Sequence, residues 1–148
     1  MSEHVEFTAI HEEHRELLRS LEEIESLIQP GPGGSGQAAA RLRGEVDRLP
    51  GALERHFERE EEGVFRMMEA EHPEWSGALD ALRREHGEIL AALESIREGA
   101  RSLRDPGLVA GIRDGLGAVL AKLRNHEHRE TELIQESVSR DLGSSSLA

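Results

Sequence analysis

The sequence predicts an all-α protein, an up-down-up-down four-helix bundle built from two repeated helical hairpins. Long stretches carry apolar residues at the three- and four-residue spacing of a helix face, and none of useful length alternates as a strand does. Proline is scarce, and Leu, Ala, Glu and Arg dominate the composition, which favours helix. A pattern in the first half of the chain also returns about 70 positions later. For 148 residues we expect a single domain over residues 1–148, with its core at about residues 8–138.

The first predicted helix covers about residues 8–28. Thr8 can cap its start after a short lead-in, and a flexible Pro- and Gly-rich loop over residues 30–36 follows its end. His14 lies inside the apolar stripe, where a lone histidine is most simply a core residue with a hydrogen-bond partner. His11 lies at the edge of the stripe, and we expect it at the surface or next to a site. The apolar stripe consists of Ile10, Leu17, Leu21, Ile24 and Ile28.

The second predicted helix covers about residues 37–71, with a kink or break near Leu49 caused by Pro50. Glu60 falls inside its apolar stripe, and His56 lies on the flank of that stripe one turn earlier. A carboxylate among apolar side chains is costly unless it is paired or binds a metal. At i and i+4 the two side chains project from one face, so one metal centre could hold both. For this pair alone, a buried Glu–His hydrogen bond or a Glu at a loose bundle end is the simpler interpretation. The stripe consists of Leu53, Phe57, Val64 and Met68.

The third predicted helix covers about residues 76–104 and carries His86 within its apolar stripe. Two residues before it have secondary roles in the prediction. Glu61 turns away from the stripe and could reach a metal only if the second helix is rotated or distorted. His72 belongs to the connector, and we expect it to be a solvated loop residue. The stripe consists of Leu79, Leu82, Ile89, Leu93 and Ile96.

The fourth predicted helix covers about residues 106–142, after an Asp-Pro-Gly turn that caps it. His126 and Glu130 lie on its inner face, whereas His128 points away from Glu130 and should be solvated. The tail over residues 143–148 is expected to be disordered. The inner face also carries Ile112, Leu116, Val119, Leu123 and Ile134.

The two halves of the chain place the same residue types at the same positions. His56 and Glu60 return as His126 and Glu130 at an offset of 70, and residues 10–24 return at an offset of 72. Chance placement of six inward polar residues is improbable, so the repeat favours a metal site. Imidazoles and carboxylates without sulfur suit iron, manganese or zinc. The expected ligands are His14, His56, Glu60, His86, His126 and Glu130.

The symmetric arrangement gives each of two metals one pair of histidines. His14 would pair with His56 and His86 with His126, although a crossed pairing remains open. Two glutamates at matching depth on the second and fourth helices could each bridge the two metals.

In this order and spacing, these residues resemble the hemerythrin-like, or HHE cation-binding, domain over about residues 8–138. The resemblance implies a non-haem centre of two iron ions, oxo- or hydroxo-bridged, with manganese and zinc as weaker alternatives. Members of the family bind dioxygen, nitric oxide or peroxide, or sense oxygen and iron. The closer resemblance is to bacterial and mycobacterial proteins with four His and two Glu.

Two departures separate this chain from the oxygen-carrying hemerythrins that it resembles. Those carriers have His-x-x-x-His on the third helix, but Leu82 stands four residues before His86. They also use an Asp five residues after the histidine of the fourth helix, whereas Glu130 follows His126 by four. Without the fifth histidine, each iron would keep one open position. We therefore expect peroxide decomposition or nitric oxide binding to outrank reversible oxygen carriage, at a modest rate because Leu and Ile wall the site.

Composition limits the partners. A net charge of −12 argues against nucleic acid and anionic membranes. No apolar run approaches 18 residues and no signal pattern opens the chain, so a cytoplasmic location is the default expectation. The absence of cysteine excludes disulfides and thiolate ligands. The expected partner is a small molecule.

Other functions stay open at this stage. The protein could sense oxygen or iron through a partner protein, which the sequence does not identify, or carry or store oxygen. A ferritin-like oxidase ranks low because none of the four histidines has Glu three residues before it. A metal-free interaction bundle conflicts with six polar residues facing inward.

Overall fold

The structure, a computed structural model, describes residues 2–28, 36–101 and 106–147. Every described residue except His72 lies in a helical element, which confirms the all-α prediction. The elements are α1 (Ser2–Ile28), α2 (Gly36–Arg59), a π turn η1 (Glu60–Val64), α3 (Phe65–Glu71), a 3-10 turn η2 (Pro73–Trp75), α4 (Ser76–Arg101) and α5 (Pro106–Leu147).

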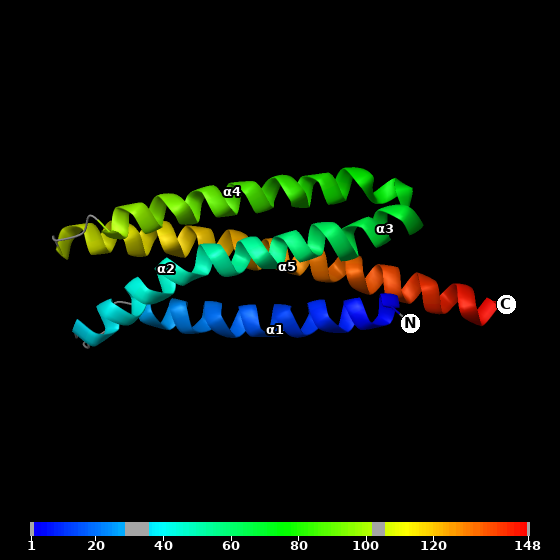
Figure 1. The fold of residues 1–148 in the computed structure, drawn as a ribbon, viewed down its shortest axis with the longest axis horizontal. Helices are drawn as coiled ribbons and strands as arrows, with labels where there is room; N and C mark the ends of the chain where they lie inside the picture. Colours follow the sequence, from blue (N-terminus) through cyan, green and yellow to red (C-terminus); the bar gives the residue numbers. More distant parts are fainter. Residues whose placement is uncertain (1, 29–35, 102–105, 148) are drawn as a thin grey trace.

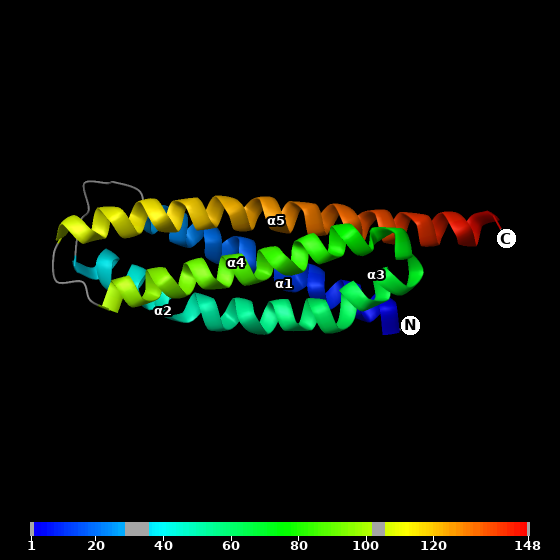
Figure 2. The ribbon, with the colours of Figure 1, turned by 90° about the horizontal axis from the view of Figure 1, so that it is seen from above.

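Four antiparallel rods form the bundle, because α2, η1 and α3 follow one another as a single rod (Figure 1). Helix α1 contacts α2 and α5, and α4 contacts the same two helices, so the four rods close into a ring. The direction alternates along the chain, as predicted. Both ribbon views show the red end of α5 extending beyond the other helices (Figures 1 and 2). Among the described residues, no helix is both long and apolar enough to cross a lipid bilayer.

The helix bounds differ from the predictions at two ends. Helix α1 begins at Ser2, so Thr8 lies inside it rather than at its cap. Helix α5 continues to Leu147 through most of the tail that was expected to be disordered. Extending a formed helix adds one hydrogen bond per residue, which favours such extensions. Helix α4 is described to Arg101, and its predicted end at residue 104 and most of the predicted loop over residues 30–36 lie outside the described residues.

The second rod departs from regular α-helical hydrogen bonding at a place that the sequence did not indicate. Helix α2 runs unbroken through Pro50, although it bends along its length in both ribbon views (Figures 1 and 2). The break in α-helical hydrogen bonding comes at η1, where the N–H of Phe65 donates to the carbonyl of Glu60. This i+5 bond inserts one extra residue into the turn, and such π turns occur often at functional sites.

Two apolar clusters fill the bundle. The long apolar cluster consists of Leu21, Ile24, Leu42, Val46, Leu49, Leu53, Phe57, Ile89, Leu93, Leu116, Val119, Leu120 and Leu123. The short apolar cluster consists of Ile10, Val64, Phe65, Met68, Leu79 and Leu82. On each rod a buried polar residue separates the two clusters along the chain, as His86 does between Leu82 and Ile89 on α4. A polar layer therefore crosses the bundle between two apolar regions.

Candidate metal centre

The six predicted site residues meet in this polar layer, and all are buried. Helix α1 provides His14, α2 provides His56, and η1 provides Glu60. Helix α4 provides His86, and α5 provides both His126 and Glu130. Two groups of possible ligand atoms result, each with its atoms within 4.8 Å of one another. The first group is His14, His56, Glu60, Glu127 and Glu130, and the second is His86, His126 and Glu130.

Glu60 lies between the two pairs of histidines. Its Oε2 is 3.3 Å from His14 Nε2, and its Oε1 is 3.1 Å from His56 Nε2. The same Oε1 is 3.7 Å from His86 Nε2 in the other pair. Burial opposes the charged form of Glu60, but the adjacent imidazoles of His14 and His56 together outweigh burial and hold its pKa at about 2. A charged carboxylate thus reaches both halves of the site.

Glu130 reaches both pairs from the opposite rod. Its Oε1 is 3.3 Å from His14 Nε2, and its Oε2 is 3.2 Å from His86 Nε2. The same Oε2 also pairs with Nε2 of His126, one helical turn earlier. The predicted pairing of the histidines and the predicted central position of both glutamates agree with this geometry.

The donor atoms fit metal ions in their spacing and in their lack of other partners. Two donors at right angles on one metal, each about 2.1 Å from it, lie about 3.0 Å apart. The Nε2-to-carboxylate distances given above from 3.1 to 3.3 Å are close to this value. Several buried atoms in the layer have no hydrogen-bond partner, including Nε2 of His56 and His126 and Oε1 of Glu60 and Glu130. Buried polar atoms without partners are costly, and a bound cation would satisfy them together.

Glu127 also lies in this cluster, although it is not among the residues predicted from the sequence. Its side chain is only 3% exposed, and Oε2 is 3.0 Å from His14 Nε2. Burial raises its pKa to about 7. The signal was present in the sequence, because the stripe Leu116, Leu120, Leu123, Glu127 and Glu130 keeps the spacing of four and three residues. Glu127 also corrects the expectation that Leu and Ile alone wall the site.

Two carboxylates outside the cluster orient the histidines of α2 and α5. Nδ1 of His56 lies 2.9 Å from Glu13 Oε2, and Nδ1 of His126 lies 2.8 Å from Glu85 Oε1. Since a carboxylate accepts, each Nδ1 carries a hydrogen, and in the neutral imidazole the Nε2 that faces the cluster is then the unprotonated nitrogen. The hydrogen bonds thus select the tautomer that metal binding requires.

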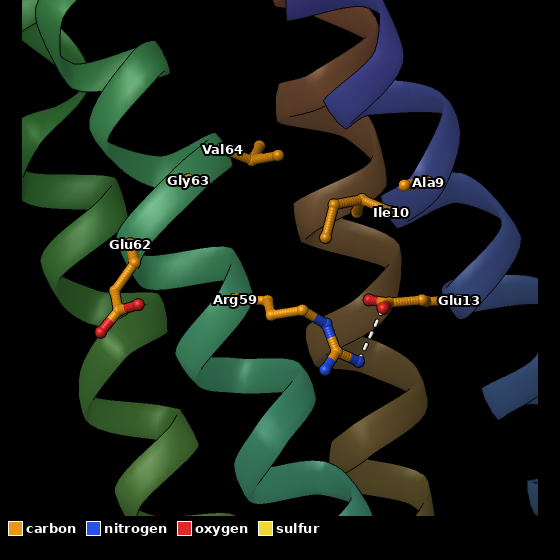
Figure 3. A pocket seen from close by; sticks show the side chains of 7 residues that line it. All are labelled: Ala9, Ile10, Glu13, Arg59, Glu62, Gly63 and Val64. Atoms are coloured by element: carbon orange, nitrogen blue, oxygen red, sulfur yellow. Dashed lines mark ion pairs between the residues drawn. The ribbon is translucent and has the colours of Figure 1, made fainter. Parts of the chain in front are cut away.

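Each orienting carboxylate is held in turn by an arginine. Arg59 lies 2.6 Å from Glu13, and Figure 3 shows it reaching from α2 across to α1. This ion pair lines a pocket of about 300 Å³, and also a second pocket of about 200 Å³ that His56 lines. Arg129 makes the same contact with Glu85 at 2.6 Å. The repeat therefore extends beyond the ligands to their supporting groups.

The histidine pairs differ in pKa direction. Burial lowers the pKa of His86 to about 3 and also lowers the pKa of His126. Burial also opposes the charged forms of His14 and His56, but the nearby carboxylates of Glu60, Glu127 and Glu13 together outweigh it and raise both pKa values. The pKa values of the first pair are therefore shifted upward and those of the second pair downward.

The remaining candidates fall outside the cluster. His11 and His128 are exposed, as predicted, and His128 pairs with Glu132. Glu61 does not join the cluster; its Oε2 lies 3.6 Å from Nδ1 of His86, the ring nitrogen that faces away from the glutamates. The π turn that contains Glu61 is the distortion on which its reach depended.

The prediction for His72 was wrong. Its side chain is buried rather than solvated, and its ring centroid lies 4.1 Å from that of Trp75. The reason is the 3-10 turn that follows it. The N–H of Trp75 donates to the carbonyl of His72 at 2.9 Å, and this bond folds the connector back so that the indole covers the imidazole.

Comparison with known protein families gives one result. The family model described as Hemerythrin HHE cation binding domain matches residues 5–137. The matched range contains all six predicted site residues and Glu127. Neither the curated proteins nor the solved structures gave a match. The buried His and Glu cluster, together with this family, indicates a metal cation, typically iron.

Proposed function

Because the chain belongs to the hemerythrin HHE cation-binding domain family, we propose that it is a non-haem di-iron protein that binds or turns over peroxide, nitric oxide or dioxygen. One observation carries the proposal. Four Nε2 atoms and two carboxylates converge in a buried layer, at ligand-to-ligand spacing and with partnerless atoms. Such a layer lowers the stability of a metal-free protein, because buried polar groups without partners cost free energy, and its donor types are those of a metal centre.

The residues divide between two metal positions. His14 and His56 would hold one ion, and His86 and His126 the other. Glu60 and Glu130 would bind both, because each approaches histidines of both pairs. Iron supplies a redox-active Lewis acid that can bind and polarise a small ligand at an open position.

The surrounding residues hold the histidine side chains in place and shield the site from water. Glu13 and Glu85 fix the rings of His56 and His126, and the two arginines hold those carboxylates in place. The long and short apolar clusters close the layer from both ends of the bundle. A small uncharged or singly charged ligand fits such a site better than a bulky substrate.

Leu82 favours binding or turnover of an oxidant over reversible oxygen carriage. It is buried in the short apolar cluster, four residues before His86, where the carriers that the chain resembles have a histidine. No ligand atom comes from that position. The second metal would therefore have fewer protein ligands than in those carriers and more room for a reacting molecule.

Metal analysis and two reactions test the proposal. Aerobically purified protein should contain about two iron ions per chain and absorb in the near-ultraviolet, as a diferric centre does. Mixing with hydrogen peroxide should release oxygen, and the reduced protein should bind nitric oxide. A well-loaded sample with one metal or none would contradict the dinuclear centre. A stable, reversible complex with dioxygen and no peroxide turnover would instead identify a carrier.

A further inference from the structure

The two halves of the site repeat one another except at one pair of inward positions. His56 corresponds to His126 and Glu60 to Glu130, but the residue after each histidine differs. It is Phe57 in the first copy and Glu127 in the second. Both side chains are buried, at 1% and 3% exposure. The asymmetry therefore lies inside the centre and not on the surface.

Glu127 faces the histidines of the first half. Its Oε2 is 3.0 Å from His14 Nε2, and its Oε1 is 3.9 Å from His56 Nε2. Neither oxygen has a hydrogen-bond partner among the described residues, so the close approach to His14 is not aligned as a hydrogen bond. A distance of 3.0 Å is what two neighbouring ligands of one metal would show, at about 3.0 Å for bonds of about 2.1 Å.

Phe57 faces a histidine of the second half. Its ring stacks on that of His86 with centroids 3.8 Å apart and planes inclined by 8°. The ring of Phe65 lies 5.5 Å from His86, nearly parallel to it. The second half thus has apolar rings where the first half has a carboxylate, and a phenyl ring offers no ligand.

We propose that Glu127 is a seventh protein ligand, bound to the metal that His14 and His56 hold. This assignment rests on the proposed di-iron function, and it gives the two metals of the centre different numbers of protein ligands. Together with Glu60 and Glu130, Glu127 gives the first metal five protein ligands. The second metal, held by His86 and His126, has four, and it takes the small exogenous ligand beside Phe57 and Phe65.

This assignment revises the expectation of one open position on each metal. That expectation counted two histidines, two shared carboxylates and the bridging oxo or hydroxo group for each ion, which together leave one position of an octahedral iron open. Glu127 adds one ligand to the first metal alone and leaves the second unchanged. A small ligand then binds at one defined position, so the first metal stays coordinatively closed while the second reacts.

Metal affinity tests the ligand directly. The metal-free chain is titrated with Fe²⁺ under argon against a chromogenic chelator, for wild type, Glu127→Gln and a control, Glu132→Gln. Glu132 is an exposed glutamate on the same helix, paired with His128. We expect wild type and the control to bind two equivalents alike. Glu127→Gln should bind one equivalent normally and the other at least about tenfold more weakly.

Azide, a small anion that occupies open positions of ferric ions, counts those positions. We expect one azide per air-oxidised wild-type centre and two per Glu127→Gln or Glu127→Ala centre. The number of azide ions bound by the wild-type protein is measured without any variant, so it tests the assignment even if the Glu127 variants fail to fold. Two azides per wild-type centre, or identical Fe²⁺ affinities in wild type and Glu127→Gln, would overturn the assignment but leave the di-iron proposal intact. A wild-type chain that binds no iron would overturn both.

Discussion

At the scale of single residues, the two central glutamates offer the sharpest test of whether the layer holds metal. Glu60 and Glu130 each contact histidines of both pairs, so in the proposed centre removing either carboxylate would take a ligand from both metals. We expect Glu60→Ala and Glu130→Ala each to lose most of the bound iron, measured by elemental analysis of folded protein. His128→Ala is the matched control, because His128 is exposed on the same helix as Glu130. Wild-type iron content in either glutamate variant would contradict the bridging position.

His72 is a buried histidine whose role is packing. Its ring lies against that of Trp75, and aromatic pairs of this kind contribute about 0.5–1.5 kcal/mol beyond the area they bury. We expect His72→Ala to lower the free energy of unfolding in urea by about 1–2 kcal/mol and to leave the iron content unchanged. The exposed His128→Ala serves again as the comparison. Loss of iron from His72→Ala would instead show that the segment containing His72 supports the metal centre.

Glu127 makes the stability of the metal-free chain depend on pH. Its pKa is raised to about 7 in the folded chain, above the ordinary value of 4.5 that an unfolded chain restores. Between pH 4.5 and about 7 the folded chain therefore keeps a proton on Glu127 that the unfolded chain has lost. As pH rises through this range to about 7, the contribution of Glu127 to the free energy of unfolding falls. Thermal melting of the metal-free proteins should show Glu127→Gln gaining on wild type from pH 5 to pH 8. A difference that does not change with pH would contradict the raised pKa.

At the scale of elements, the π turn changes which side chains of the second rod face the core. The repeat relates Phe65 to Gln135 on α5, which is exposed, and Met67 to Ser137, which is buried. On the second rod the opposite holds, because Phe65 is fully buried and Met67 only partly. The extra residue of η1 thus turns Phe65 inward, toward His86.

Deleting Gly63 tests whether the π turn holds one extra residue. The deletion leaves Phe65 four residues after Glu60, so a regular α-helix would present Phe65 to the core as the π turn now does. We therefore expect an unchanged far-UV circular dichroism spectrum and little change in the free energy of unfolding. Phe65→Ala is the comparison and should lose about 3–5 kcal/mol, as for loss of a buried Phe. A loss from the deletion as large as that of Phe65→Ala would contradict this account of the turn.

The sequence predicted the rods and the six residues that meet in the polar layer, because both depend on local periodicity and on the repeat. It did not predict η1, since no residue type in Glu60–Val64 marks a π turn and the benefit lies in the distant contact with His86. Glu127 was not predicted because the repeat places an apolar residue, Phe57, at the equivalent position of the first copy. The adjacent residues His126 and Glu127 both face the polar layer, since long side chains reach it from a wider arc than an apolar stripe occupies. The burial of His72 depends on its contact with Trp75, which the 3-10 turn Pro73–Trp75 creates, and the sequence pattern of the connector does not indicate that turn.

At the scale of the whole molecule, the polar layer separates two apolar regions that can hold the bundle together without metal. Binding to the native state alone adds stability by mass action, about 2.7 kcal/mol at a ligand concentration 100 times Kd. We expect chelation to lower the melting temperature while the far-UV spectrum stays helical. Glu60→Ala, already depleted of iron, should melt at a temperature that the chelator hardly changes. An unchanged melting temperature for wild type would contradict metal binding in the layer.

The division of the chain into two hairpins has a consequence for how such a centre can diversify. One hairpin, α1 with the second rod, carries His14 and His56, and the other, α4 with α5, carries His86 and His126. A homodimer of a single hairpin would have the same four inward positions. A gene for that hairpin, however, would have to place one residue type at both positions after the histidine. Fusion of two copies in one chain removes this restriction, and here a phenyl ring occupies one of the equivalent positions and a carboxylate the other.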